Sequence, residues 1–142
     1  MYTYTEINED LQSNGGQKAS EADPKMKSAE FISRCFAARN AMHIFHLKTP
    51  LYSAHKAAQG FYEGIIPLID SFAESVMGRM GKFDQFPNVK ESSDDGLQII
   101  GNLTKWVDAN RMNLPQLSEI QNITDEIVSL CNSTAYLLRE LR

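Results

Sequence analysis

The sequence predicts an all-α protein, an antiparallel four-helix bundle. Four segments place apolar residues at alternating spacings of three and four, and short or medium loops join them. Strand-like alternation is confined to residues 1–7. At 142 residues the chain has the length of one domain. We therefore expect a helical domain over residues 23–142, preceded by a flexible arm over residues 1–22 that is rich in small and polar residues.

The first helix is predicted to begin at Asp23-Pro24, because an acceptor side chain followed by proline favours a helix start. It should end before Pro50, since the residue preceding a proline is pushed out of the helical region. Its apolar stripe consists of Phe31, Cys35, Ala38, Met42 and Phe45.

The second helix is predicted over residues 50–78 and carries a proline in its interior. Pro67 cannot donate to the carbonyl of Glu63, so we expect a bend or a local defect there, at a cost of about 3 kcal/mol without compensating packing. The buried side is predicted to hold Ala54, Ala58, Phe61, Ile65, Ile69, Phe72 and Val76.

The third and fourth helices follow a predicted loop over residues 78–91. Ser92 or Ser93, with two aspartates after it, is expected to start the third helix, and Pro115 marks the approximate start of the fourth. The third helix should bury Leu97, Ile100, Leu103 or Thr104, and Val107. The fourth should bury Ile120, Ile123, Ile127, Leu130, Thr134, Leu137 and Leu141. Tyr62, Trp106 and Tyr136 are expected to be core aromatics.

Composition excludes several classes of function. The net charge of -4 has the wrong sign for a protein that neutralises nucleic-acid phosphates. No apolar run approaches the roughly 20 residues of a membrane span, and the first residues lack the pattern of a secretory signal. We therefore expect a soluble, cytoplasmic protein without nucleic-acid or membrane partners. Cys35 and Cys131 lie among apolar residues, so they are predicted to be buried free thiols.

All three histidines, His43, His46 and His55, lie in one short window. On the following helix, Asp70 and Glu74 fall on the same arc as His55, as Glu63 also does. Imidazole and carboxylate are the usual ligands of iron, zinc and manganese, so this set is a candidate metal site. The simpler alternative is that His43 or His46 caps the end of the first helix, where a cation is favourable, while Asp70 and Glu74 form a solvated face.

Distance decides what geometry such a site requires. His55 and Asp70 are fifteen residues apart, roughly 22 Å along one helix, so they cannot bind one ion in a single chain. Two chains with the second helix packed antiparallel about a two-fold axis bring His55 of one chain opposite Asp70 and Glu74 of the other. The sequence therefore predicts a homo-oligomer with intersubunit sites, to which His43 or His46 adds an imidazole.

The run from His43 to His55, with Phe61-Tyr62, Asp70 and Ala73-Glu74 after it, resembles the ferroxidase signature of Dps-type ferritin-like proteins. The intervals match at His43, His55, Asp70 and Glu74. A gapped alignment makes His46 the equivalent of the first histidine, and Gln59 stands where the family commonly has a second acid. The resemblance implies a ferritin-like bundle that binds Fe(II) or a similar divalent ion, oxidises it with oxygen or peroxide and sequesters it.

The same segment also resembles a family of uncharacterised tailed-bacteriophage proteins with a similar pattern of His, Tyr, His, Phe-Tyr, Asp and Glu. This second resemblance implies a competing function. In that interpretation the chain is a non-enzymatic phage accessory or virion component that binds phage structural partners, and the metal site has decayed. Its location is then the cytoplasm of the host cell or the virion.

Overall fold

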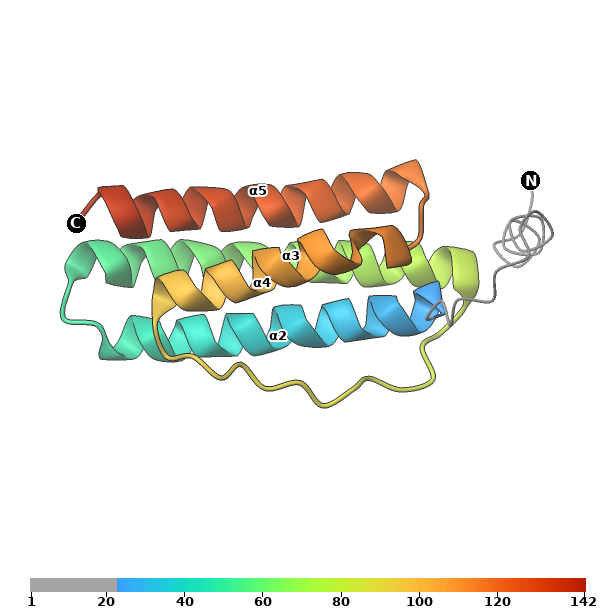
Figure 1. Ribbon diagram of the computed structural model, residues 1–142, viewed down its shortest axis with the longest axis horizontal. Helices are drawn as coiled ribbons and strands as arrows, with labels where there is room; N and C mark the ends of the chain where they lie inside the picture. The colour runs from blue at the N-terminus through green and yellow to red at the C-terminus, as the bar shows by residue number, and fades with distance from the viewer. Residues whose placement is uncertain (1–22) are drawn as a thin grey trace.

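The computed structural model describes residues 23–142, so the predicted arm and the strand-like stretch of residues 1–7 lie outside the described residues. This part of the chain folds into four α-helices and one short 3-10 helix (Figure 1). They are α2 (Pro24–Lys48), α3 (Tyr52–Met80), α4 (Gly96–Asn110), η1 (Arg111–Asn113) and α5 (Ser118–Glu140). No strand occurs between residues 23 and 142, so the prediction of an all-α fold is confirmed.

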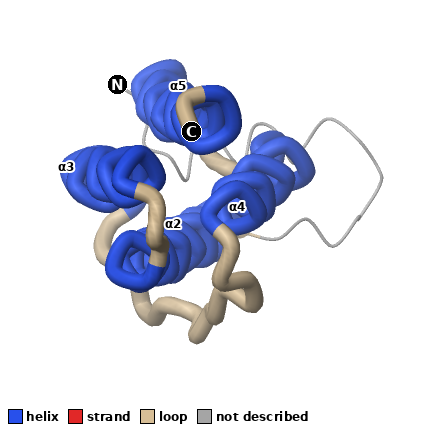
Figure 2. Tube along the Cα trace, turned by 90° about the vertical axis from the view of Figure 1, so that its left-hand side faces the viewer, coloured by secondary structure: helices blue, strands red, loops and turns tan. Residues whose placement is uncertain are grey.

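The four helices lie side by side around one core. Helix α2 packs against α3 and α4, and α5 packs against the same two helices, which gives the spatial order α2, α3, α5, α4 (Figure 2). Each neighbouring pair in this order runs antiparallel (Figure 1). A short turn joins α2 to α3, whereas residues 81–95 form a long connection that returns past α2 to the start of α4. Among the described helices, none is long and apolar enough to cross a membrane.

The predicted stripes of the first two helices form much of this core. Phe31, Cys35, Ala38 and Met42 of α2 are buried, whereas Phe45 is only half-buried. All seven residues predicted for α3 are buried, and Ala57 joins them. Helix α3 continues without a break across Pro67, which is exposed. The missing hydrogen bond therefore falls on the solvent side, where water can donate to the free Glu63 carbonyl.

Two helix starts differ from the prediction. Helix α4 begins at Gly96, because the Asp95 side chain accepts a hydrogen bond of 3.0 Å from the Gln98 N–H and caps the helix there. The hydroxyl of Ser93 lies outside the helix and accepts from the Asp95 N–H at 3.1 Å. Helix α5 begins at Ser118 instead of near Pro115, since η1 and an extended stretch fill the connection from α4.

The buried line of α5 matches the prediction at three positions and lies one residue further along than predicted at three others. It consists of Ile120, Thr124, Ile127, Cys131, Thr134 and Leu138. Leu137 and Leu141 were predicted to be buried but are 38% and 49% exposed, and Tyr136 is 50% exposed. The apolar pattern alone misses Thr124, whose hydroxyl donates to the Ile120 carbonyl at 3.0 Å. This local bond satisfies the hydroxyl and makes its burial inexpensive.

Candidate functional site

The three histidines gather at the turn between α2 and α3, together with Tyr62. His43 and His46 lie in the last turns of α2, and His55 lies in the first turn of α3. The rings of His46 and His55 stack with their centroids 3.5 Å apart, and the rings of His43 and Tyr62 stack at 3.9 Å. The structure thus brings His43, His46 and His55 into one cluster, which we call the histidine cluster.

His46 and His55 bind each other's backbone through two reciprocal hydrogen bonds. Nδ1 of His46 donates to the carbonyl of His55 at 2.7 Å, and Nδ1 of His55 donates to the carbonyl of His46 at 2.8 Å. Because a carbonyl oxygen only accepts, both Nδ1 atoms carry the hydrogen. The lone pair of each neutral ring is therefore on Nε2.

Pro50 explains why the His46 carbonyl needs a side-chain donor. In a continuing helix this carbonyl would accept from the backbone of residue 50, but proline has no N–H. The preceding carbonyl, that of Phe45, is satisfied by the Thr49 N–H at 2.9 Å. His55 supplies the donor that the next carbonyl lacks, and His46 itself is only 8% exposed. The histidine cluster therefore caps α2 and fastens it to α3.

The stacking opposes a shared ion between His46 and His55. Their rings are inclined by only 21° at a centroid distance of 3.5 Å. An ion about 2.0–2.1 Å from Nε2 in the plane of one ring would lie well out of the plane of the other. In addition, Nε2 of His46 faces the Tyr62 hydroxyl at 3.4 Å. Consistent with this geometry, residues 23–142 hold no group of three or more His, Cys, Asp or Glu arranged for a metal ion.

The candidate carboxylates lie further along α3, away from the histidine cluster. Asp70 and Glu74 are exposed, and no other described residue forms an ion pair with them. Glu63 is also exposed and accepts from the Gln59 amide at 3.0 Å. Within one chain the imidazoles and these carboxylates thus do not meet, in line with the fifteen-residue separation of His55 and Asp70.

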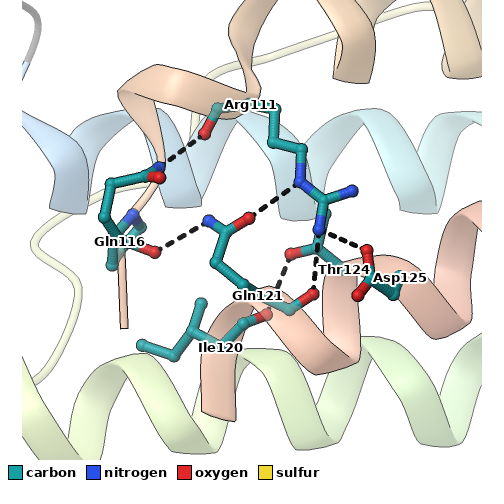
Figure 3. Close-up of polar contacts among 7 residues, drawn as sticks. Arg111, Gln116, Ile120, Gln121, Thr124 and Asp125 are labelled. Carbon is teal, nitrogen blue, oxygen red and sulfur yellow. Dashed lines mark hydrogen bonds and ion pairs between the residues drawn. The ribbon is translucent and has the colours of Figure 1, made fainter. Parts of the chain in front are cut away.

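A second polar cluster, missed by the sequence analysis, joins η1 to α5 (Figure 3). The Arg111 guanidinium donates to the Gln121 side chain at 2.7 Å and to its backbone carbonyl at 3.1 Å, and it pairs with Asp125. The Gln121 amide donates to the Pro115 carbonyl at 3.0 Å, and Gln116 donates to the Arg111 carbonyl at 2.9 Å. These groups satisfy one another, so the cluster holds the connection in place and offers no free base.

Both cysteines are buried free thiols, as predicted, each 1% exposed. Burial raises the pKa of the Cys131 thiol to about 12. Burial, together with the neighbouring Cys131, holds the pKa of the Cys35 thiol well above its usual range. A thiol that stays protonated is a poor nucleophile and a poor metal ligand. Burial therefore disfavours the reactive thiolate form of both cysteines.

The exposed apolar side chains are concentrated at one end of the molecule. Of eleven large apolar residues exposed in the described part of the chain, seven lie at the end formed by the α2–α3 turn and the last turns of α5 (Figures 1 and 2). We call this surface the apolar end. Its members are Ile44, Leu47, Leu51, Tyr52, Tyr136, Leu137 and Leu141.

The fold and these surfaces define a helical protein whose histidines brace a turn and whose apolar residues emerge at one end. The chain belongs to the family described as "Family of unknown function (DUF5856)", whose model matches residues 46–138. The matched residues include His46, His55, Asp70 and Glu74 and begin after His43.

A relative of the chain comes from a bacteriophage. The chain is 25% identical over 121 residues to the "Uncharacterized 14.6 kDa protein in mobD-ri intergenic region" of Enterobacteria phage T4, and the match covers 84% of this chain and 93% of that protein. No solved structure matches the chain. The predicted resemblance to phage proteins is thereby confirmed, whereas the resemblance to ferritin-like proteins gains no support.

Proposed function

We propose that the chain is a non-enzymatic bacteriophage accessory or structural protein that acts by binding other protein chains, in the host cell or in the virion. The apolar end is the observation that carries this proposal. The similarity to a phage T4 protein supports the viral setting.

Exposed apolar surface is costly unless something covers it. Single exposed apolar side chains are normal, but a contiguous apolar patch of several hundred Å² marks a protein interaction site. Tyr52 and Leu47 are 74% and 72% exposed, more than any other residue of the apolar end. A burial gain of about 25 cal/mol per Å² is therefore available to a partner that covers them.

The polar clusters support a non-enzymatic role. His46 and His55 each donate the Nδ1 hydrogen to a backbone carbonyl, and the Tyr62 hydroxyl faces the remaining nitrogen of His46. An acid–base catalyst needs a group within reach of a substrate proton and free to exchange it. Three of the four ring nitrogens of His46 and His55 thus make contacts within the chain, and only Nε2 of His55 has no partner among the described residues.

Site-specific photo-cross-linking tests this proposal. A photoreactive phenylalanine analogue replaces Tyr52 in the full chain, which is produced alongside the other genes of its phage. Met112, at the opposite end of the molecule, is the matched control because it is 78% exposed, close to the 74% of Tyr52. We expect covalent adducts to protein from position 52 and few from position 112. Equal yields at the two positions would contradict the proposal.

As a second candidate we propose intersubunit metal binding in a ferritin-like four-helix bundle. The antiparallel order with one long crossover supports such a fold, and the exposed Asp70 and Glu74 leave their oxygens available to a partner chain. In a homo-oligomer with α3 packed on α3, His55 would meet these carboxylates about a two-fold axis, with His43 as the second imidazole because His46 stacks on His55. The ion would be Fe(II), with oxygen or peroxide as oxidant and sequestration of the product.

Metal analysis separates the two candidates. The protein is purified without chelator, and bound metal per chain is compared between the wild type and the double variant His55→Ala, Asp70→Ala. Equal, near-zero metal in both is expected for the interaction protein. Stoichiometric metal in the wild type that disappears in the variant would favour the ferritin-like function.

A further inference from the structure

We infer that the apolar end binds a second copy of this chain end to end about a two-fold axis. This inference rests on the proposed function and names the partner. It differs from the side-by-side pairing of α3 helices that an intersubunit metal site needs.

Packing between α3 and α5 brings distant parts of the sequence together at the apolar end. A Cβ on Gly64 would lie 3.4 Å from the Leu130 methyl carbons, so these two residues face each other. The two helices run antiparallel (Figure 1). Two helical turns, or seven residues, toward the end of α5 and toward the start of α3, Leu137 therefore comes opposite Ala57. Leu137 and Leu141 thus lie beside the start of α3, where Tyr52 is exposed.

Charges of opposite sign flank the apolar end on its α3 and α4 sides, while the α5 side carries the Arg139–Glu140 ion pair and Arg142. Lys56 lies on the α3 side, with its ammonium 5.9 Å from the centre of the Tyr52 ring, and Lys48 ends α2. Asp94 lies just before α4, whose first residue packs so closely on α2 that a Cβ on Gly96 would come within 2.9 Å of the Phe45 ring. No ion pair involves Lys48, Lys56 or Asp94 among the described residues.

This charge arrangement is self-complementary. In spatial order α4 and α3 lie on opposite sides of α2, so the acidic and basic sides of the apolar end are separated by the α2–α3 turn. A two-fold axis through the end places the basic side of each copy against the acidic side of the other. A second copy therefore satisfies both charges and covers the apolar centre at the same time.

The exposed area of these residues is comparable to the area that a stable dimer buries. The seven side chains are 38% to 74% exposed and together present on the order of 700 Å². A standard stable interface buries about 800 Å² per partner. The apolar end thus approaches that area before its charged rim is included.

The mass of the full chain in solution tests the inference. Sedimentation equilibrium should give a dimer for the wild type and a monomer for Leu47→Asp, Tyr52→Asp, because buried unpaired charges oppose association. Met112→Asp, at the other end, is the matched control and should remain a dimer. Circular dichroism verifies that each variant keeps its helices. A monomeric wild type, or a dimeric double variant with intact helices, would overturn the inference.

Charge reversal tests the two-fold geometry. Lys48→Glu, Lys56→Glu makes both sides of the end acidic, and Asp94→Lys removes the acidic side, so each variant alone should dimerise several-fold more weakly. Mixing the two should restore association as a heterodimer, because both contacts then pair opposite charges. Undiminished homodimers and no heterodimer would contradict the proposed orientation. Cross-linking at position 52 to a different protein, with a monomeric wild type, would overturn this inference and leave the proposed function standing.

Discussion

At the scale of single residues, Pro50 and His55 act as a pair. The proline ends α2 and removes the donor for the His46 carbonyl, and the imidazole of His55 replaces it at 2.8 Å. A structural role thus accounts for a residue that its spacing also makes a candidate metal ligand.

Substitutions at His55 test this capping role. His55→Leu should lower the free energy of unfolding by about 1–3 kcal/mol, because it leaves the His46 carbonyl without its donor. His55→Asn places an amide N–H near the position of Nδ1, so its free energy of unfolding should fall clearly less than that of His55→Leu. Urea denaturation measures both values. Equal stability of the Leu and Asn variants would show that the hydrogen bond contributes little.

Because of the buried thiols, the free energy of unfolding should fall as the pH becomes alkaline. The pKa of Cys131 is about 12 in the folded chain against 9.0 for an unperturbed thiol, and burial raises the pKa of Cys35 in the same direction. The unfolded chain therefore releases these protons first, so the stabilisation is complete below pH 9 and is lost as the pH rises above it. Urea denaturation from pH 8 to 10.5 should show a decline that is smaller in Cys35→Ala, Cys131→Ala. An identical slope in that variant would contradict this assignment.

The convergence of the three histidines was predictable because they lie within one helix end, one turn and one helix start. The hydrogen-bond acceptors of His46 and His55 could not be predicted, since these are backbone carbonyls whose positions depend on the path of the turn. The Arg111 cluster was missed for a related reason. Its members are joined through η1, and the sequence pattern gave no sign of that short helix.

At the scale of helices, α3 was predicted well because its buried side consists only of apolar residues at regular spacing. Helix α5 has a wider apolar stripe that also contains buried Thr124 and Thr134. Hydrophobicity alone cannot choose the buried line within such a stripe. The threonine hydroxyls donate to the Ile120 and Leu130 carbonyls, which lowers the free-energy cost of burying these polar groups.

Two glycines with different surroundings test helix packing. Gly60 has no atom within 4 Å of an added Cβ and lies inside α3, so Gly60→Ala should raise the free energy of unfolding by about 0.5–1 kcal/mol. At Gly96 an added Cβ would be 2.9 Å from the Phe45 ring, and Gly96→Ala should cost about 1–3 kcal/mol. Thermal or urea unfolding measures both. A stabilised Gly96→Ala variant would mean that α4 and α2 are less tightly packed than described.

At the scale of the whole molecule, the helix order determines which residues share a surface. The apolar end combines residues 44–52 with residues 136–141, and the sequence assigned Tyr136, Leu137 and Leu141 to the core. Only the antiparallel packing of α3 and α5 shows that the end of α5 lies beside the start of α3 (Figure 1). The apolar pattern therefore predicted every helix that forms the candidate interface but not the interface itself.

The relative cross-linking yield at positions 52 and 112 shows whether partners bind at the apolar end, since both side chains are similarly exposed and lie at opposite ends of the molecule. We expect protein adducts to form predominantly at position 52 and to disappear when Leu47 is replaced by Asp. Adducts of equal yield at both positions, unaffected by Leu47→Asp, would show that the apolar end is not where this protein binds its partners.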